Sequence, residues 1–213
     1  MDAKEGKKSR LKKFFQEFWF LLWKDNSVKG WIFSVLFLLV FIKFIFFPLL
    51  SLITGTSLPL AIVESCSMYH KDNLLSDFDS WWQTHEEKYQ KFNISDSNFT
   101  EFPLKKGFNK GDILFIIRAN PDKIEVGDII IFSASQRNPI IHRVIGIREI
   151  NGERLFSTIG DNNDGQLPFE HLIKEEQLVG KASVKVAPYL GWIKLVFYDW
   201  KKPESERGFC DNN

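Results

Sequence analysis

The chain has 213 residues, of which 28 are Lys or Arg and 27 are Asp or Glu, so its formal net charge is +1. This length suffices for one soluble domain of about 150 residues together with a membrane anchor. The small net charge argues against a nucleic-acid partner, which usually requires a strongly basic face. The two cysteines, Cys66 and Cys210, exclude a disulfide framework and a zinc site of ordinary spacing.

Residues 1–30 form a basic and amphipathic segment. Eight Lys or Arg residues precede Trp31. Apolar residues recur at helical spacing with polar residues on the other side, namely Leu11, Phe14, Phe15, Phe18 and Leu22. This pattern predicts a helix that lies in the inner leaflet interface. A helix that packs on a partner subunit would have the same pattern.

An apolar run from Trp31 to Ile53 predicts a single transmembrane helix. Nineteen of its 23 residues are apolar, and as a helix it spans about 34 Å, enough for a hydrocarbon core of about 30 Å. Lys43 raises the free energy of membrane insertion by about 3 kcal/mol, and the favourable contributions of the surrounding apolar residues outweigh this cost. Pro48 is expected to kink the helix or to end its regular part. The run starts too late and is too long for a removable signal peptide.

The distribution of charge predicts the orientation of this helix. The positive-inside rule keeps residues 1–30 in the cytoplasm and sends the residues after 53 to the outer side. Glycosylation sequons begin at Asn93 and Asn98 on that side.

Residues 58–200 are expected to form an extracytoplasmic, mainly β domain, followed by a polar tail at 201–213. Asn151-Gly152 between two apolar runs is a strong hairpin signal. No long amphipathic helix alternates with the runs, so we predict an antiparallel barrel or folded sheet. The predicted strands are 60–63, 112–117, 128–132, 140–147, 154–158, 179–186 and 192–197.

A polar and aromatic insertion interrupts this domain at about residues 70–106. It contains Trp81-Trp82, and Ser76 with Asp79 can cap a helix that runs to about Lys91. A solvated surface excursion is one interpretation. A lid or a membrane-facing element is the other, because paired tryptophans favour interfaces.

Three residues in separate runs carry the chemistry of hydrolysis. Ser67 lies shortly after the apolar run, His142 lies in a predicted strand, and Asp161 lies in a Gly-Asp-Asn turn. A serine hydroxyl needs a base within hydrogen-bond reach to act as a nucleophile. A hydroxyl, an imidazole and a carboxylate on a membrane-tethered domain suggest a serine hydrolase.

Four separated boxes resemble the type I signal peptidase family and cover nearly all of residues 31–197. Ser-Cys-Ser-Met at 65–68 is similar to the family's Ser-Gly-Ser-Met box, with Cys66 in place of glycine. Residues 126–132 resemble its Gly-Asp box with an apolar strand. Residues 141–144 match the His-Arg-Val form of the archaeal and endoplasmic-reticulum branch. Gly-Asp-Asn-Asn at 160–163 resembles the last box.

The resemblance implies a role for each matched residue. Ser67 would be the nucleophile and His142 the general base, with Ser65 and Met68 in the oxyanion or substrate-binding region. Asp161 would orient the histidine, with Asp164 as the second candidate, since the later aspartate of the relatives has no clear counterpart here: Asp164 comes early and Glu170 late, and Glu170 is the next acid to test. No metal or organic cofactor is implied.

Alternatives to these roles stay open at the level of sequence. His70 is a rival base, and the thiol of Cys66 is a rival nucleophile. Asp161 can also be a turn residue whose carboxylate binds local backbone amides. A Cys66–Cys210 bridge is disfavoured because Cys66 borders the candidate nucleophile. Cys66 also makes a positive φ in this turn less favourable.

We therefore expect a membrane-anchored serine endopeptidase that removes signal peptides from secretory preproteins. Its partners would be signal peptides, the lipid bilayer, and secretion-channel or accessory subunits. It would cross the cell membrane, as in archaea, or the endoplasmic reticulum membrane once. A peptidase for another membrane-tethered precursor, and a catalytically silent β scaffold in a membrane complex, are the alternatives. A self-cleaving repressor-type peptidase fits less well, because neither a lysine base nor a DNA-binding domain is visible.

Overall fold

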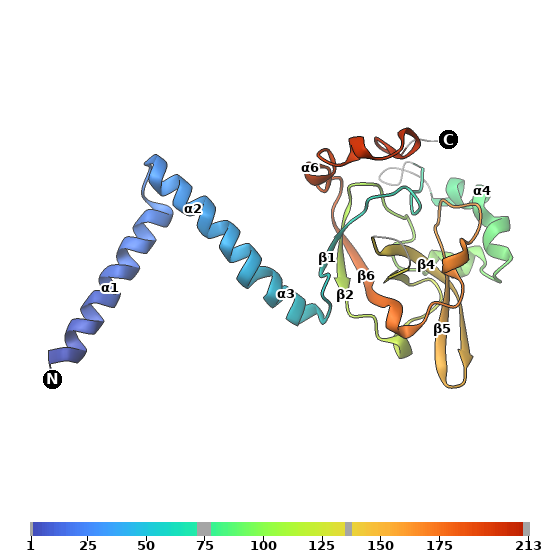
Figure 1. Cartoon of the computed structure of the whole chain (residues 1–213). Helices are drawn as coiled ribbons and strands as arrows, with labels where there is room; N and C mark the ends of the chain where they lie inside the picture. Colours follow the sequence, from blue (N-terminus) through green and yellow to red (C-terminus); the bar gives the residue numbers. More distant parts are fainter. Residues whose placement is uncertain (1, 72–77, 135–137, 211–213) are drawn as a thin grey trace. The chain divides into compact units, whose positions relative to one another are not determined.

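The computed structural model describes residues 2–71, 78–134 and 138–210, and it is shown in Figure 1. The chain divides into two compact units, Met1–Ile53 and Thr54–Asn213. The first unit is helical and the second contains the sheet. The predicted helix cap at Ser76 lies outside the described residues.

The helical unit consists of a first helix and a long apolar one. Helix α1 spans Asp2–Trp23. After a turn, α2 (Val28–Phe41), the π-helical turn η1 (Ile42–Phe46) and α3 (Phe47–Thr54) follow one another without a break. Within the described residues, the helix Val28–Thr54 is the one that is long and apolar enough to cross a membrane. It includes the predicted span 31–53.

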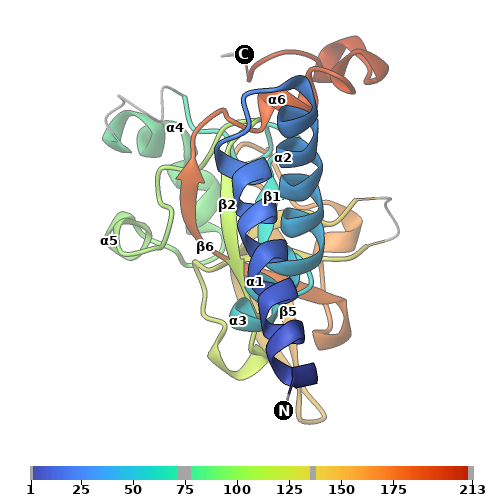
Figure 2. The ribbon, with the colours of Figure 1, turned by 90° about the vertical axis from the view of Figure 1, so that its left-hand side faces the viewer.

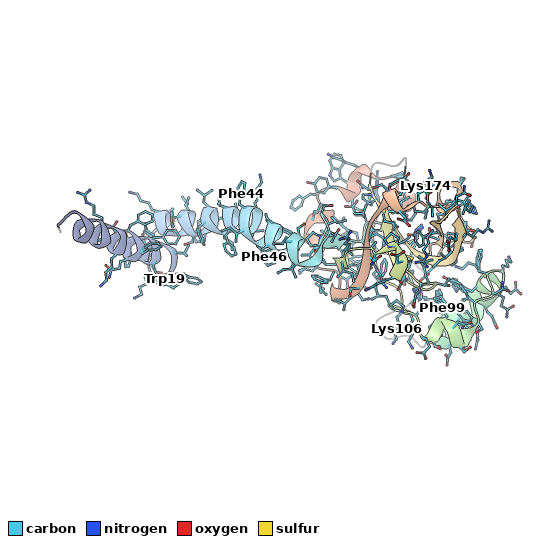
Figure 3. The ribbon with its side chains drawn as sticks, turned by 90° about the horizontal axis from the view of Figure 1, so that it is seen from below. Trp19, Phe44, Phe46, Phe99, Lys106 and Lys174 are labelled. Carbon is cyan, nitrogen blue, oxygen red and sulfur yellow. A yellow bond between two sulfur atoms is a disulfide. The ribbon has the colours of Figure 1, made fainter. Side chains whose placement is uncertain are left out.

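The π-helical turn has a local cause in Pro48. Proline lacks an N–H group, and its ring collides with the carbonyl four residues earlier, here that of Phe44. The wider turn Ile42–Phe46 accommodates this defect without ending the helix. Figure 3 shows Phe44 and Phe46 on this stretch.

The amphipathic helix expected within residues 1–30 packs on the apolar helix along part of its length. The ring of Phe18 in α1 lies 5.7 Å from that of Phe33 and 5.3 Å from that of Phe37, both in α2. Ser34 Oγ donates a hydrogen bond of 2.9 Å to the backbone oxygen of Leu22. Other aromatic side chains of α1, such as Trp19, remain exposed.

The second unit is built on one antiparallel sheet of six strands in the order β1-β2-β6-β3-β4-β5. Figure 2 shows β2 beside β6 at the centre of the unit. The strands are β1 (Leu60–Ile62), β2 (Ile113–Ile117), β3 (Ile129–Phe132), β4 (Ile140–Ile150), β5 (Glu153–Ile159) and β6 (Leu178–Ala187). The mainly β prediction is therefore confirmed.

The hairpin predicted at Asn151-Gly152 is confirmed. Ile150 pairs with Glu153 across a two-residue turn, and Asn151 and Gly152 have φ values of 55° and 81°. Two consecutive positive φ values define the hairpin turn that Asn-Gly favours.

The strand predicted at 192–197 is wrong, because this run begins with the short helix α6 (Trp192–Leu195). Lys194 N and Leu195 N both donate to Gly191 O at 3.0 Å, which closes the first turn. Leu195 is 2% exposed whereas Ile193 is 69% exposed. A short apolar run does not distinguish a strand from a helix turn by periodicity.

The insertion folds onto the sheet as two helices, α4 (Phe78–Gln90) and α5 (Asp96–Thr100), which lie on the same side of the sheet in Figure 2. Figure 3 labels Phe99 of α5, which is fully buried. Trp81 and Trp82 are each 5% exposed, in a core cluster that includes Ile145 of β4 and Ile159 of β5. The paired tryptophans therefore form a core, and neither a solvated excursion nor a membrane-facing element describes them.

Cys66 and Cys210 form a disulfide, with Cα atoms 5.5 Å apart, contrary to the expectation from sequence. At the level of sequence, the position of Cys66 beside Ser67 disfavours this bridge. The two cysteines are 144 residues apart in the chain, so only the tertiary fold brings them together.

Candidate active site

Ser67 lies in a turn that follows the edge strand β1. We call residues 63–69 the serine turn. Tyr69 N donates to Cys66 O at 3.0 Å, which closes the turn. The described non-glycine residues with positive φ do not include Cys66, so a Cβ is accommodated here in the place of the family's glycine. Ser67 is half-buried, and Ser65 is exposed.

His142 reaches Ser67 from strand β4. It is the third residue of that strand and pairs with Ile130 of β3. Its Nε2 lies 2.9 Å from Ser67 Oγ, within hydrogen-bond distance. His142 is 4% exposed, so the neighbouring strands fix its ring. The structure thus brings together the serine and histidine that the sequence selected.

The carboxylate beside His142 belongs to Glu170. Its Oε1 lies 2.5 Å from His142 Nδ1, and its residue is fully buried. Leu167 N donates to Glu170 Oε2 at 2.6 Å, and Thr158 Oγ1 donates to Oε1 at 3.3 Å. These donors hold the carboxylate in place, and Ser67, His142 and Glu170 form a hydrogen-bonded chain.

The sequence favoured Asp161 for this contact, then Asp164, with Glu170 as the next candidate, and Glu170 is the acid that lies there. Both ring nitrogens of His142 are occupied, by Ser67 and by Glu170. Asp164 is exposed. A signal for Glu170 existed in the sequence, since Leu167-Pro-Phe-Glu170 places proline first and glutamate third in a short helical turn. In that pattern the glutamate bends back to the residue before the turn.

Asp161 instead forms a buried ion pair with Arg143, the residue after the histidine. Arg143 Nη2 donates to Asp161 Oδ2 at 2.7 Å and Arg143 Nε donates to Oδ1 at 2.9 Å, and neither residue is exposed. Tyr89 of the insertion donates to Oδ1 at 2.8 Å. Burial by itself would raise the pKa of Asp161, but the charge of Arg143 and the hydrogen bonds from His70 and Arg143 hold that pKa well below its usual range.

The loop that contains Asp161 supports Ser67 through the backbone. Asn162 N donates to Ser67 O at 2.8 Å. Lys88 of α4 donates to the backbone oxygens of Asp161 and Asn163 at 2.6 and 3.0 Å. A Cβ on Gly160 would approach Ser67 O to 2.7 Å, so the loop and the serine turn lie in close contact. Asp161 is thus linked to Ser67 through its loop.

His70, the rival base, is also bound to Asp161. Its Nε2 lies 2.9 Å from Asp161 Oδ2, and its ring stacks on Trp81 with centroids 3.6 Å apart. Only 2% of His70 is exposed. Burial lowers the pKa of His70 from 6.5 to about 4, although Asp161 opposes this shift. His70 is therefore neutral at physiological pH and serves in the buried cluster.

The two remaining candidates, Ser65 and Met68, lie in different surroundings. Ser65 Oγ is 3.1 Å from Ser67 Oγ, beside the nucleophile candidate. Met68 is 1% exposed and belongs to the hydrophobic core with Phe108. Its sulfur accepts a hydrogen bond of 3.4 Å from Asp161 N. Met68 thus packs the turn from within the core, whereas its sequence pattern suggested a place at the substrate.

A groove of about 700 Å³ leads to Ser67 and His142. One wall is β1, which forms an edge of the sheet. The other begins at Asn138 and continues through the start of β4. In the described sheet, β5 pairs with β4 only from Arg143 onward, so Ile140–His142 pair with β3 alone. Most of the lining is apolar and includes Leu60, Ala61, Ile62, Phe108, Ile131, Ile140 and Ile141.

This arrangement can perform covalent hydrolysis. A histidine at 2.9 Å can accept the serine proton, and a carboxylate on the other ring nitrogen fixes the tautomer and stabilises the imidazolium. Among the described residues, no group of three or more His, Cys, Asp or Glu side chains is arranged to hold a metal ion.

A serine–histidine–carboxylate chain beside a groove is typical of serine hydrolases. No protein-family model matches the chain. Its relatives include a signal peptidase complex catalytic subunit SEC11C of Homo sapiens, 32% identical over 106 residues, which are 46% of this chain and 55% of that protein. The SEC11 subunit of Lachancea thermotolerans is 34% identical over 101 residues, 43% of this chain and 59% of that protein.

A putative SEC11B subunit of Homo sapiens is 34% identical over 110 residues, which are 48% of this chain and 66% of that protein. The chain thus spans a little over half to about two thirds of the length of these relatives. These similarities support the resemblance to the type I signal peptidase family, in the branch that the His-Arg-Val box predicts.

The pKa of His70 predicts how stability depends on pH. The unfolded chain binds this proton near pH 6.5, whereas the folded protein binds it only near pH 4. The free energy of unfolding should therefore fall by about 3 kcal/mol as the pH falls from 6.5 to 4. Denaturant titrations of the full chain in detergent at several pH values measure the slope of the free energy of unfolding against pH.

His70→Gln should flatten the slope, because glutamine keeps an N–H donor for Asp161 but does not titrate. His171→Gln, at an exposed position, is the control and should keep the wild-type slope. Equal slopes in the wild type and in His70→Gln would contradict the assignment.

Proposed function

We propose that this protein is a membrane-anchored serine endopeptidase that removes signal peptides from preproteins. The observation that carries the proposal is the chain of hydrogen bonds from Glu170 through His142 to Ser67 at the groove. The relatives named as signal peptidase catalytic subunits supply the substrate class. The apolar helix Val28–Thr54 supplies the anchor.

In this mechanism Ser67 Oγ attacks the scissile carbonyl while His142 Nε2 takes its proton. The His142 ring then gives that proton to the leaving amine, which frees the new N-terminus of the mature protein. A water molecule, activated by the same nitrogen, hydrolyses the acyl-enzyme. Glu170 acts as the orienting acid in place of Asp161, and Ser65 lies where it can donate to the developing oxyanion.

The groove fits an extended peptide. The outer edge of β1 and the first residues of β4 offer backbone groups to a strand laid between them. Alternate side chains of such a strand point to the same face, where Ala61, Ile131 and Ile141 provide apolar surface. A signal peptide held in the same bilayer by its own apolar segment would present its cleavage site at a high effective concentration.

The anchor places the catalytic unit on the outer side of the membrane in this proposal. Residues 1–30 would remain cytoplasmic, residues 31–53 would span, and the β domain would face the endoplasmic reticulum lumen or the cell exterior. Accessory subunits would join it, as the names of its relatives indicate for those proteins. The disulfide Cys66–Cys210 agrees with an oxidising compartment.

A silent scaffold is the second candidate class, and the site argues against it. A scaffold does not require a buried glutamate on one nitrogen of a histidine and a serine hydroxyl on the other. Labelling of Ser67 by a serine-reactive probe separates the two classes. A peptidase for another membrane-tethered precursor would share the mechanism and differ in its substrate.

Substitutions in the proposed triad should abolish or strongly reduce cleavage. We expect Ser67→Ala and His142→Ala to lose cleavage of a model preprotein by reconstituted protein. Glu170→Gln should lower kcat by about 10³-fold or more, because the amide favours the wrong histidine tautomer. Asp164→Asn is the matched control, exposed on the same loop, and should stay near the wild-type rate. An active Glu170→Gln variant would overturn the assignment of the acid.

The resemblance to signal peptidases implies shallow apolar pockets, and hence a preference for small side chains at the first and third positions before the cut. Bulky residues should displace the carbonyl from Ser67, and a misplacement of about 1 Å costs on the order of 100-fold in rate. The measurement is kcat/KM for a preprotein series with Ala, Val, Leu and Phe at each position. A preference for large or charged residues at the first position would reject signal peptide cleavage.

The proposed orientation predicts modification at the sequons. Asn93 and Asn98 are exposed, so both are accessible to a glycosylation enzyme on the outer side. Translation of the chain with microsomes should give a glycosylated product that Asn93→Gln together with Asn98→Gln removes. Protease that digests the β domain from the cytoplasmic side of sealed microsomes would contradict this orientation.

A further inference from the structure

The chain after α6 forms a strap that is attached to the serine turn. We define the strap as residues 191–210, which run from α6 to the labelled end of the chain in Figure 1. Cys210 is joined to Cys66 by the disulfide, directly before Ser67. Lys202 Nζ donates to Glu64 O at 2.5 Å, and Lys194 Nζ lies 3.5 Å from Glu64 Oε1. The strap thus holds the residues on both sides of Ser65.

The strap is itself fixed to the β domain. Lys110, in the loop before β2, is 1% exposed, and its Nζ lies 2.5 Å from Asp199 Oδ1 and donates to Glu206 O at 2.7 Å. Trp192 Nε1 donates to Lys110 O at 2.9 Å. Gly208 N donates to Asp199 Oδ2 at 2.7 Å. A buried ion pair and backbone contacts therefore give the strap a defined position.

The serine turn is held from a second direction by the Asp161 loop. Asn162 N donates to Ser67 O at 2.8 Å, and Asn162 Nδ2 donates to Cys66 O at 3.2 Å. The strap therefore holds the turn covalently at Cys66 and through Lys202 at Glu64, and the Asp161 loop holds it by hydrogen bonds. The core side of the turn is held as well, since Phe108 N donates to Met68 O at 2.9 Å. Without the disulfide, Cys66 would keep the hydrogen bonds that its backbone oxygen accepts from Asn162 and Tyr69, and would lose its covalent link to the strap.

We propose that the Cys66–Cys210 bridge is a positioning link for the nucleophile, which keeps Ser67 and Ser65 aligned with the scissile carbonyl. The proposal rests on the proposed function. A nucleophile acts from a narrow range of positions, so a looser turn lowers the rate of the chemical step. The backbone edges that would bind a peptide lie in β1 and β4, whose pairing with β2 and β3 does not involve the bridge. The effect should therefore fall on kcat, with KM little changed.

The experiment compares Cys66→Ser, Cys210→Ser and the double variant with the wild-type full chain, reconstituted in lipid with a model preprotein. We expect kcat to fall about 10- to 100-fold in all three variants and KM to stay within about threefold. The three losses should be equal, because either single substitution already breaks the bridge. Dithiothreitol, which reduces the bridge as it closes its own disulfide, should bring the wild type to the same rate and leave the double variant unchanged.

Active-site titration separates positioning from folding. A serine-reactive probe counts the competent sites, so kcat per titrated site excludes molecules that fail to fold. Lys202→Met loosens the same turn without touching the bridge and should also lower kcat. Lys201→Met, a neighbouring exposed lysine whose described contact is with the ring of Trp200, is the matched control and should cleave at the wild-type rate.

Several outcomes would overturn the proposal. Wild-type kcat per titrated site in Cys66→Ser and Cys210→Ser is one of them. A loss in Cys66→Ser alone is another, because it would point to the side chain of Cys66 instead of the bridge. Undiminished cleavage by Ser67→Ala would reject the proposed function itself, and this result is distinguishable from any effect of the bridge.

Discussion

The buried ion pair between Arg143 and Asp161 is the interaction on which the rest of the β domain depends. Neither residue is exposed, and Arg143 also donates to Gly127 O at 2.9 Å and Leu104 O at 3.2 Å. The pair therefore ties β4 to the Gly-Asp turn, to the insertion and to the loop that supports Ser67. A buried pair of this kind is costly to break, by about 3–5 kcal/mol, because the remaining charge stays buried without a partner. Arg143 follows His142 directly in β4, so the packing around the ion pair also fixes the position of His142.

Two carboxylates near the site have separate tasks, and their surroundings explain the division. Asp161 faces a guanidinium, a phenol and an imidazole, which keep it ionised and fixed. Glu170 faces His142 and is held by a backbone amide. One carboxylate organises the fold around the site, and the other contacts the histidine that we propose as the base. The aspartate of the Gly-Asp-Asn-Asn box is thus not the group that contacts His142 in this chain, and Glu170 takes that place.

The insertion and the strap extend the support of the serine turn beyond the sheet. The insertion buries Trp81 and Phe99 on the sheet. Its Lys88 donates to the backbone oxygen of Asp161, and the next residue, Asn162, donates its backbone N–H to Ser67 O. The strap reaches the same turn from another direction through Cys210. The half-buried Ser67 therefore lies at a point where three distant parts of the sequence meet. This convergence gives a serine in an irregular turn a defined position, which a turn of this length would not have alone.

The sequence by itself determined the features that depend on local pattern. The apolar run 31–53 predicted a helix long and apolar enough to cross a membrane, because hydrophobic length is a local property. The Asn151-Gly152 hairpin followed from backbone preference, and the residues Ser67 and His142 followed from short boxes. Tertiary structure decided which acid meets His142, which face of 192–197 is buried, and that Cys66 meets Cys210. Each of these depends on distances between residues far apart in the chain, or on packing that a short apolar run does not encode.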